Sequence, residues 1–259
     1  MNAPPATTLV WDSDFFGCRV ARADSSRLTA DSLEQLLQWC RTERVDWLYF
    51  LADSDDRDTV MLAESAGFHF VDVRLELELT LATRPRRQAA ERAGVRIRPA
   101  TAADLGALRP MAADVHTDSR YFFDARVPTE RARALYETWI ERSVTSNFAN
   151  VVLVAEVDGA AAAYITGRLD RDASASIGLI GVGEPARGLG IGTALVQALL
   201  DWAESQGAAR ATVVTQGRNV VAQRLYQSAG FRTRAAFLWY HFWPARGRTV
   251  AQSPALSAR

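Results

Sequence analysis

The sequence is poor in cysteine and histidine and has no excess of charge of either sign. The two cysteines, Cys18 and Cys40, are too few and too far apart for a disulfide framework or a CxxC metal site. We therefore expect no metal, and both thiols buried as small hydrophobic side chains in a reducing compartment. Basic and acidic residues number 30 each, so no overall field favours nucleic acid or an anionic membrane surface.

Long apolar runs are also missing. No basic segment followed by an apolar one marks a signal peptide, and no apolar run approaches the length of a bilayer span. We therefore expect a cytoplasmic protein that does not contact a membrane. The 259 residues are 48% hydrophobic and 23% charged, which is ordinary for a globular protein and sufficient for one large domain or two modest ones.

Composition divides the chain into four segments. Residues 83–94 are charged and lie between strand-like runs, which indicates a linker. Residues 244–259 are Arg, Ser, Ala and Pro without periodicity, which indicates a disordered tail. We expect a small α/β domain over residues 8–82 and a larger α/β domain over residues 95–243.

The smaller segment alternates strands and helices. Asp31 and Glu34 have the spacing of a capping box at the start of a helix. We expect a helix over 31–43, a buried strand over 47–51, a short helix over 58–65 and an exposed edge strand over 72–81.

The larger segment combines a hairpin with alternating strands and helices. Thr101 is expected to cap a helix after a first strand, and Asp158-Gly159 to turn the hairpin. We expect a helix over 130–144 that buries Leu135, Tyr136, Trp139 and Ile140, strands over 174–182, 211–215 and 235–242, and helices over 190–205 and 219–228. This order predicts a mixed α/β sheet.

The most informative stretch is the glycine-rich turn between the strand at 174–182 and the following helix. A helix N-terminus presents unpaired N–H groups and partial positive charge, which suits a pyrophosphate. Gly188, Gly190 and Gly192 remove the Cβ atoms that would keep the backbone from the anion, and Arg187 adds a full charge. A turn that merely packs remains the alternative.

Two other phosphate motifs fit this stretch poorly. A P-loop needs Gly-Lys-Ser/Thr after its glycines, and the sequence has none here. Gly181, Gly183 and Ala186 match the letters of a dinucleotide fingerprint. However, the acid about twenty residues further on, Asp201, falls inside the helix rather than at a strand end.

A second element follows downstream. Asn219 and Tyr226 are seven residues apart and share a helix face, in Asn-Val-Val-Ala-Gln-Arg-Leu-Tyr-Gln-Ser-Ala-Gly-Phe. With Arg187-x-x-Gly190-x-Gly192, this resembles the Q/R-x-x-G-x-G/A and N-x-x-A-x-x-x-Y-x-x-x-G-F motifs of the GNAT acetyltransferase superfamily. The resemblance covers about 95–243. It implies a GNAT fold, with a mixed, mostly antiparallel sheet flanked by helices, which follows the smaller α/β domain along the chain.

The resemblance also implies acetyl-CoA as the co-substrate, and it assigns roles to individual residues. Tyr226 would donate a proton to the leaving thiolate, although a core aromatic side chain is the alternative, and Asn219 would hydrogen-bond the pantetheine. The pantetheine would also pair with the backbone of Ile180, Gly181 and Val182, and the pyrophosphate would lie on Arg187, Gly188, Leu189, Gly190, Ile191, Gly192 and Thr193.

The sequence identifies no general base. Many GNAT enzymes have a glutamate near the end of the strand before the asparagine, but here residues 212–216 contain no acid. His116 and Glu156 are candidates only because they are ionisable, and His69 and His241 alternate with apolar residues as structural histidines would. Proton removal through water, or binding of the deprotonated amine, stays open.

Longer stretches, at 11–22, 116–128, 135–144 and 213–231, are similar to bacterial dTDP-fucosamine acetyltransferases. This implies that a nucleotide-linked amino sugar, of the dTDP-4-amino-4,6-dideoxyhexose type, accepts acetyl by direct attack in a ternary complex. Arg120 and Arg126 could meet its diphosphate and Tyr121 could stack on it, or this loop is simply anchored in the core. Another amine acceptor, a non-catalytic coenzyme A-binding module and a homodimer stay open.

The sequence also contains an internal echo. A strand, a helix, Ser-Ala-Gly-Phe and a second strand occur around 65–68 and again around 228–231. A helix that ends in glycine before a buried phenylalanine is common, so coincidence is the alternative. If the repeat is real, Ala63 occupies the place of Tyr226, and we expect the N-terminal copy to lack chemistry of its own.

Overall fold

The structure is a computed structural model that describes residues 3–85, 94–170 and 172–244. It divides into two compact units. The first unit contains the chain up to Arg74, Ser119–Arg131 and the chain from Ala236, and the second contains Leu75–Asp118 and Ala132–Ala235.

The two units do not coincide with the expected domains at 8–82 and 95–243. Strands β4 (His69–Thr80) and β10 (Arg232–Phe242) each contribute residues to both units, so packing does not divide the chain where its composition changes. The expected division therefore stays a prediction. Most of the expected linker and almost all of the expected tail lie outside the described residues.

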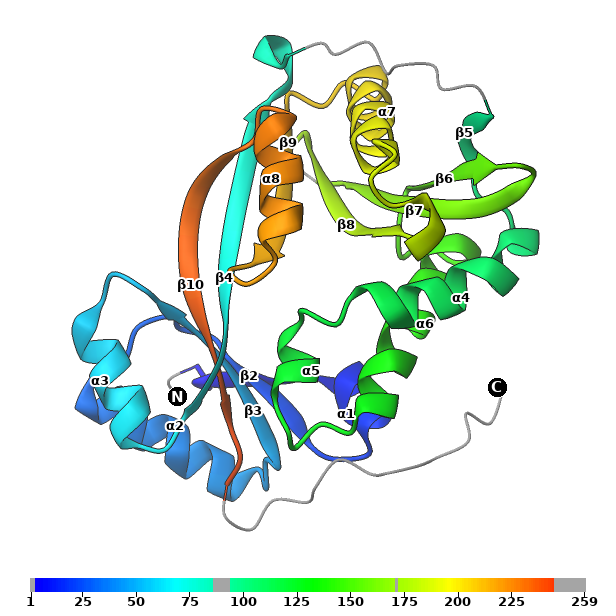
Figure 1. Ribbon diagram of the computed structural model, residues 1–259. Helices are drawn as coiled ribbons and strands as arrows, with labels where there is room; N and C mark the ends of the chain where they lie inside the picture. Colours follow the sequence, from blue (N-terminus) through cyan, green and yellow to red (C-terminus); the bar gives the residue numbers. More distant parts are fainter. Residues whose placement is uncertain (1–2, 86–93, 171, 245–259) are drawn as a thin grey trace. The chain divides into compact units, whose positions relative to one another are not determined.

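The first unit is built on strands in the order β1-β2-β3-β10-β4 (Figure 1). Its elements are β1 (Ala6–Thr8), α1 (Val10–Phe16), β2 (Val20–Ala23), α2 (Ala30–Thr42), β3 (Trp47–Asp53), α3 (Arg57–Ser65), α5 (Arg120–Phe123) and its parts of β4 and β10. Strands β2 and β3 are parallel, whereas β3 and β10 are antiparallel. Cys18 and Cys40 are buried free thiols, as the sequence predicts.

Helix α2 begins with a different cap from the expected one. Thr29 and Ser32, rather than Asp31 and Glu34, form the capping box: the Ser32 N–H donates to Thr29 Oγ1 (3.2 Å) and the Thr29 N–H donates to Ser32 Oγ (2.8 Å). The apolar side of the helix then buries Leu36. The expected cap lay two residues too far along the chain, because Thr29 and Ser32 have the same capping-box spacing as the two acids.

The second unit has strands in the order β10-β4-β9-β8-β7-β6-β5. Its further elements are β5 (Val95–Pro99), α4 (Leu105–Val115), α6 (Thr129–Thr145), β6 (Val151–Val157), β7 (Ala160–Leu169), β8 (Ser174–Val182), α7 (Ile191–Ser205), β9 (Arg210–Gln216), α8 (Val220–Ser228) and the 3₁₀ turns Leu81–Thr83, Ala102–Asp104 and Glu184–Ala186. Strands β5 to β8 are antiparallel neighbours and β8 is parallel to β9. The mixed, mostly antiparallel sheet is as predicted.

The expectation that β4 is an exposed edge strand is wrong. It lies between β10 and β9, and Leu77 and Leu79 are buried in the core of the second unit. Glu76 and Glu78 on the other face pair with Arg234. The alternation of apolar and polar residues therefore reports one solvated face, and it does not distinguish a central strand from an edge strand.

The internal repeat is a structural fact. Strand β3 begins at Trp47 and β9 at Arg210, 163 residues later, and the same separation relates the starts of α3 and α8 and of β4 and β10. Even the hydrogen bonds that end the helices correspond, because the Phe68 N–H donates to Ala63 O and the Phe231 N–H to Tyr226 O, both at 3.0 Å. The two segments thus share the order and spacing of these elements, and we call them the N-terminal and C-terminal copies.

The copies differ where the first strand leads into its helix. Val20 pairs with Trp47 as Ser174 pairs with Arg210, and Val20 and Ser174 are only 154 residues apart. The N-terminal copy is therefore nine residues shorter between the starts of β2 and β3 than its counterpart is between the starts of β8 and β9.

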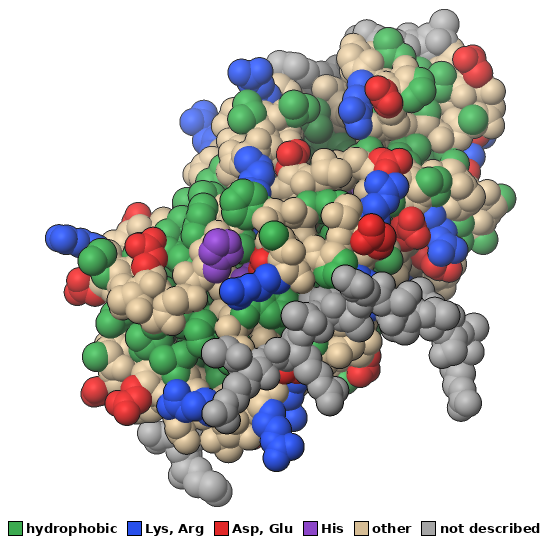
Figure 2. All heavy atoms as spheres, turned by 60° about the horizontal axis from the view of Figure 1, so that its bottom comes forward, with side chains coloured by type: hydrophobic (Ala, Val, Ile, Leu, Met, Phe, Trp, Pro, Cys, Tyr) green, Lys and Arg blue, Asp and Glu red, His purple; other side chains and the backbone are tan. Residues whose placement is uncertain are grey.

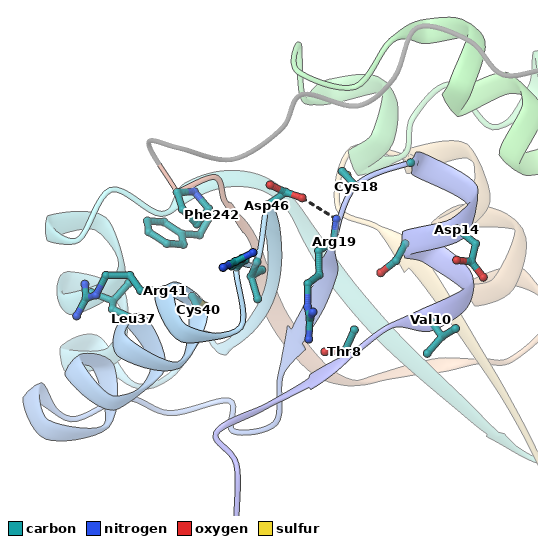
Figure 3. Close-up of a pocket in the computed structure, with 15 residues that line it drawn as sticks. Thr8, Val10, Asp14, Cys18, Arg19, Leu37, Cys40, Arg41, Asp46 and Phe242 are labelled. Atoms are coloured by element: carbon teal, nitrogen blue, oxygen red, sulfur yellow. Dashed lines mark hydrogen bonds between the residues drawn. The ribbon is translucent and has the colours of Figure 1, made fainter.

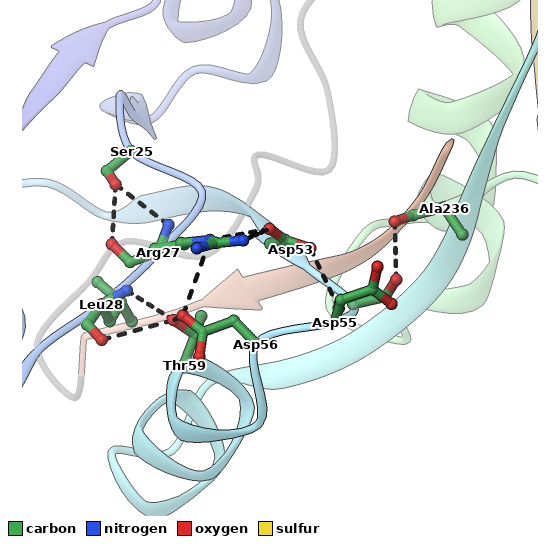
Figure 4. Close-up of polar contacts among 9 residues, drawn as sticks. Ser25, Arg27, Leu28, Asp53, Asp55, Asp56, Thr59 and Ala236 are labelled. Carbon is green, nitrogen blue, oxygen red and sulfur yellow. Dashed lines mark hydrogen bonds and ion pairs between the residues drawn. The ribbon is translucent and has the colours of Figure 1, made fainter. Parts of the chain in front are cut away.

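Side chains close the shortened segment of the N-terminal copy (Figure 4). Arg27 Nη2 pairs with Asp53 Oδ2 at 2.7 Å, the Leu28 N–H donates to Thr59 Oγ1 at 2.7 Å, and the Thr59 hydroxyl donates to Asp56 Oδ2 at 2.8 Å. These contacts tie the carboxyl end of β3 to the chain before α2.

Candidate functional site

Strands β8 and β9 separate after a short parallel pairing. The pairing runs from Ser174 with Arg210 to Ile177 with Val213. Beyond Ile177, β8 continues to pair with β7, and Figure 1 shows it turning away from β9. A bulge contributes to this turn, because Thr166 of β7 accepts the Leu179 N–H on its hydroxyl at 2.8 Å.

The separation leaves one edge of β8 without a β partner. In the described part of the second unit, Ile180, Gly181 and Val182 pair only with β7. Their other backbone edge faces the gap that opens toward β9, so an extended polar chain could add to the sheet there. The expected pantetheine-binding strand thus has the open edge that this role requires.

The glycine-rich turn presents free N–H groups. No N–H from Gly188 to Thr193 donates to a described residue, and the first N–H of α7 to do so is that of Ala194, to Gly190 O at 3.1 Å. Gly188 and Gly190 have φ of 73° and 71°, values that only glycine adopts readily. Six consecutive N–H groups therefore stand at the positive end of a 15-residue helix.

Arg187 connects this turn to the end of β8. Its side chain is exposed, and Nε donates to Val182 O at 3.3 Å. Gly192 packs the turn against α8, since an added Cβ would lie 3.5 Å from Leu225 Cδ2. The predicted binding residues 180–182 and 187–193 are thus brought together at one end of β8.

Gly181 has a packing role that the sequence did not reveal. A Cβ at this position would lie 2.6 Å from Tyr164 Cε1 and 2.9 Å from Val115 Cγ2. Tyr164 is fully buried and has little room to move. Glycine is required here by the neighbouring ring, independently of any ligand.

Helix α8 carries the two polar residues of the second motif. Asn219 caps it, because Oδ1 accepts the Ala222 N–H at 2.9 Å. Tyr226 is 3% exposed and stands edge-to-face with Phe231 at 5.8 Å. Its hydroxyl makes no hydrogen bond to a described residue, and burial raises the pKa of the phenol above its ordinary value. Tyr226 therefore keeps its proton at neutral pH and can act as a donor.

Both ionisable candidates are already engaged by other side chains. Glu156 accepts from Arg98 Nε at 2.7 Å, in a cluster with Asp104, which occupies its carboxylate. His116 Nε2 lies 2.8 Å from the Tyr164 hydroxyl, and burial lowers the pKa of its imidazole to about 4. His116 is thus neutral at pH 7 but a weak proton acceptor.

The other two histidines differ from each other. His241 is fully buried, and its Nδ1 lies 2.7 Å from Asp124 Oδ2, so the structural role expected for it is confirmed. His69 is exposed, so the same expectation was wrong for that residue. Alternation in a strand did not show which face was buried.

The expected acceptor residues all belong to the first unit, where they pack against aromatic side chains. Arg120 lies over the rings of Tyr49, Tyr121 and Trp239 at 4.9, 4.3 and 4.3 Å, and Nη2 donates to the Tyr121 hydroxyl at 2.6 Å. Tyr121 is only 3% exposed. Arg126 lies 5.9 Å from the Trp243 ring. Residues Arg120–Phe123 of this segment form a short helix, α5, where the sequence suggested a loop, whereas Arg126 lies outside that helix.

A hollow of 1370 Å³ lies in the first unit (Figure 3), where Cys18, Arg19, Cys40 and Asp46 contribute to its lining. It lies at the amino ends of β2 and β3, where the Arg19 N–H donates to Asp46 at 2.8 Å. Ligands of parallel strands bind at the carboxyl ends. The hollow therefore lies at the end of these strands where a ligand is not expected, and we assign no function to it.

Three further observations concern the surface charge, metal binding and membrane-spanning helices. On the face shown in Figure 2, basic and acidic side chains are interspersed, as the balanced composition predicts. Among the described residues, no group of three or more His, Cys, Asp or Glu is placed to hold a metal ion. None of the described helices has the length and apolarity to span a membrane.

Residues 112–231 match the acetyltransferase (GNAT) family. A Bacillus subtilis spore coat polysaccharide biosynthesis protein, SpsD, is 31% identical over 148 residues, 57% of this chain and 50% of that protein, so the chain spans about half of this relative. A dTDP-fucosamine acetyltransferase of Escherichia coli is 26% identical over 238 residues, 90% of this chain and 96% of that protein. An uncharacterized N-acetyltransferase of Methanocaldococcus jannaschii is 32% identical over 116 residues, 44% of this chain and 74% of that protein.

Solved structures share the fold. A GCN5-related N-acetyltransferase from Sphaerobacter thermophilus superposes with a TM-score of 0.64 at 17% identity, covering 94% of this chain and 78% of that chain. The similarity therefore extends through both units.

Proposed function

The chain belongs to the acetyltransferase (GNAT) family and is an N-acetyltransferase, and from this premise we propose that it moves acetyl from acetyl-CoA to a nucleotide-linked amino sugar. The observation that carries the cofactor assignment is the run of six N–H groups from Gly188 to Thr193 that donate to no described residue. An anion at a helix N-terminus satisfies such groups. Arg187 adds a full positive charge at the mouth of the turn.

The open edge of β8 supports the same placement. A pantetheine arm has amides that can pair with the backbone of Ile180 to Val182, as a strand would. The amide nitrogen of Asn219 has no partner among the described residues and can donate to the arm, while its oxygen caps α8. These contacts hold the thioester near Tyr226.

The proposed reaction is direct attack in a ternary complex. The bound thioester supplies an activated acetyl group. The amine nitrogen forms a bond to the acetyl carbon, the carbon–sulfur bond breaks, and Tyr226 gives its proton to the departing thiolate. Residues 212–216 at the end of β9 contain no acid, and His116 is a weak base, so we propose that the amine loses its proton to water.

The acceptor assignment is supported by similarity along almost the whole chain. The E. coli protein, named for acetylation of dTDP-fucosamine, matches 90% of this chain, which includes the first unit as well as the acetyl-CoA motifs. SpsD, the B. subtilis relative, is named for the biosynthesis of a spore coat polysaccharide. An amino sugar attached to a nucleotide diphosphate is the acceptor class that fits both names.

An acceptor panel tests this proposal. Purified protein and acetyl-CoA would be incubated with dTDP-4-amino-4,6-dideoxyhexoses, with a polyamine and with a peptide carrying a free N-terminus, while thiol release is followed. We expect turnover with a dTDP-amino sugar. Preference for the polyamine or the peptide would replace the acceptor, and acetyl-CoA binding without turnover of any amine would leave a non-catalytic binding module.

A further inference from the structure

Arg131 is a buried arginine of the first unit that has no counter-ion among the residues that the structure describes. It is the third residue of α6 and is 7% exposed. Its guanidinium makes no hydrogen bond or ion pair with a described residue, and Nε is shut off from solvent. One face of the guanidinium lies over the Phe15 ring, 4.5 Å from its centroid.

This arrangement costs stability in two ways. A buried cation without a partner loses its hydration and regains nothing from a carboxylate, and burial accordingly lowers the pKa of Arg131. A basic side chain in the first turn of a helix also meets the positive end of the helix dipole. The cation–π contact with Phe15 offsets only part of this cost. An anion would remove both penalties.

Other arginines nearby do not share this property. Arg120 and Arg126 of the same segment lie against aromatic rings, and Arg120 also donates to a hydroxyl. Arg133, two residues further along α6, is exposed and paired with Asp114. Arg131 alone among these combines burial with the absence of a described partner.

We propose that the Arg131 guanidinium and the N–H groups of Thr129 and Glu130, at the start of α6, form a phosphate-binding subsite; the Arg131 N–H itself donates to Pro128 O at 2.9 Å. A guanidinium fork donates two parallel hydrogen bonds to phosphate oxygens, and free N–H groups at a helix N-terminus donate to the same anion. The source of the phosphate rests on the proposed function: it is the diphosphate of the nucleotide-linked acceptor. The subsite differs from the acceptor residues Arg120, Tyr121 and Arg126 expected from the sequence.

Calorimetric titration with dTDP tests the subsite without any acetyl transfer. We expect Arg131→Met to weaken dTDP binding at least about tenfold and Arg131→Lys to weaken it less, because lysine keeps the charge but loses the fork. The matched control Arg133→Met should bind as the wild type does. Acetyl-CoA affinity, measured on the same samples, should be unchanged and reports that the second unit is folded.

Melting temperature without ligand gives an independent readout. Arg131→Met should melt higher than the wild type, because an uncompensated buried charge is removed. A lower melting temperature would make Arg131 a structural residue, and equal dTDP affinity would leave the phosphate elsewhere; either result overturns the proposal. Binding of inorganic pyrophosphate but not dTDP would overturn the nucleotide source. The acceptor panel is scored separately, so failure of the proposed function is distinguishable.

Discussion

Replacing Tyr226 with phenylalanine removes one hydroxyl and keeps the ring. The ring is 3% exposed and packs edge-to-face with Phe231, while the hydroxyl makes no hydrogen bond to a described residue. The free energy of unfolding should therefore change by less than about 1 kcal/mol. Loss of a positioned proton donor costs about 10²- to 10⁴-fold in rate, or roughly 3–5 kcal/mol of barrier. The change should thus separate catalysis from stability.

Steady-state thiol release, with acetyl-CoA affinity measured by calorimetry, is the assay. We expect Tyr226→Phe to lower kcat and leave the affinity for acetyl-CoA unchanged. Tyr240→Phe is the matched control, because Tyr240 is a 1% exposed tyrosine of the first unit whose hydroxyl donates to Glu64 at 3.3 Å; its kcat should stay normal. A wild-type kcat in Tyr226→Phe would refute the donor role and leave Tyr226 with a packing role alone.

Three further outcomes follow from the packing and charge of individual residues. Gly192→Asp should keep or raise stability, since an acid suits the first turn of a helix, but should weaken acetyl-CoA binding in calorimetry. Gly192→Ala should weaken binding less, because it adds a Cβ without a negative charge and this Cβ meets Leu225 only at 3.5 Å. Equal affinity in both variants would contradict the phosphate role of the turn. Gly181→Ala should lower the free energy of unfolding by about 1–3 kcal/mol, since its Cβ would lie 2.6 Å from Tyr164; an unchanged denaturation midpoint would show that the ring yields. Burial lowers the pKa of His241 to about 4, from 6.5, so the unfolded chain binds this proton first as pH falls. Its contribution, at most about 3 kcal/mol, is present above pH 6.5 and lost toward pH 4. Melting curves of His241→Gln should fall less steeply over this window than those of the wild type or of His69→Gln, and parallel curves would count against this origin of the pH dependence.

Local features of the fold could be read from the sequence because each depends on a few neighbouring residues. Asp158 and Gly159 turn the hairpin with φ of 50° and 83°, and Gly190 ends the strand-to-helix turn where its spacing placed it. The helix over 129–145 buries Leu135 and Ile140 as its periodicity predicted. The motif positions came from resemblance, and their assigned roles stay predictions.

What sequence reasoning missed depends on partners far along the chain. Whether β4 is central or at an edge is decided by β9 and β10, which no local pattern reveals. Arg131 was overlooked because an arginine in a first helical turn looks exposed, and only the structure shows its burial. One signal was available: extending the internal echo into an alignment of the chain with itself would have shown that the N-terminal copy lacks nine residues between the starts of β2 and β3.

The sharing of β4 and β10 between the units has a consequence for synthesis. The first copy leaves the ribosome well before Phe237–Phe242, the residues that pair with Leu48–Asp53 of β3. Until they appear, the edge of β3, with the sequence Trp-Leu-Tyr-Phe-Leu-Ala-Asp, is unpaired and apolar, which invites association with other chains.

The first unit of a nascent chain therefore cannot complete its sheet until strand β10 has been synthesised. Both units complete their folding only when β10 has left the ribosome. We expect a polypeptide that stops before Ala236 to be recovered as aggregate, although it contains every element of the first copy.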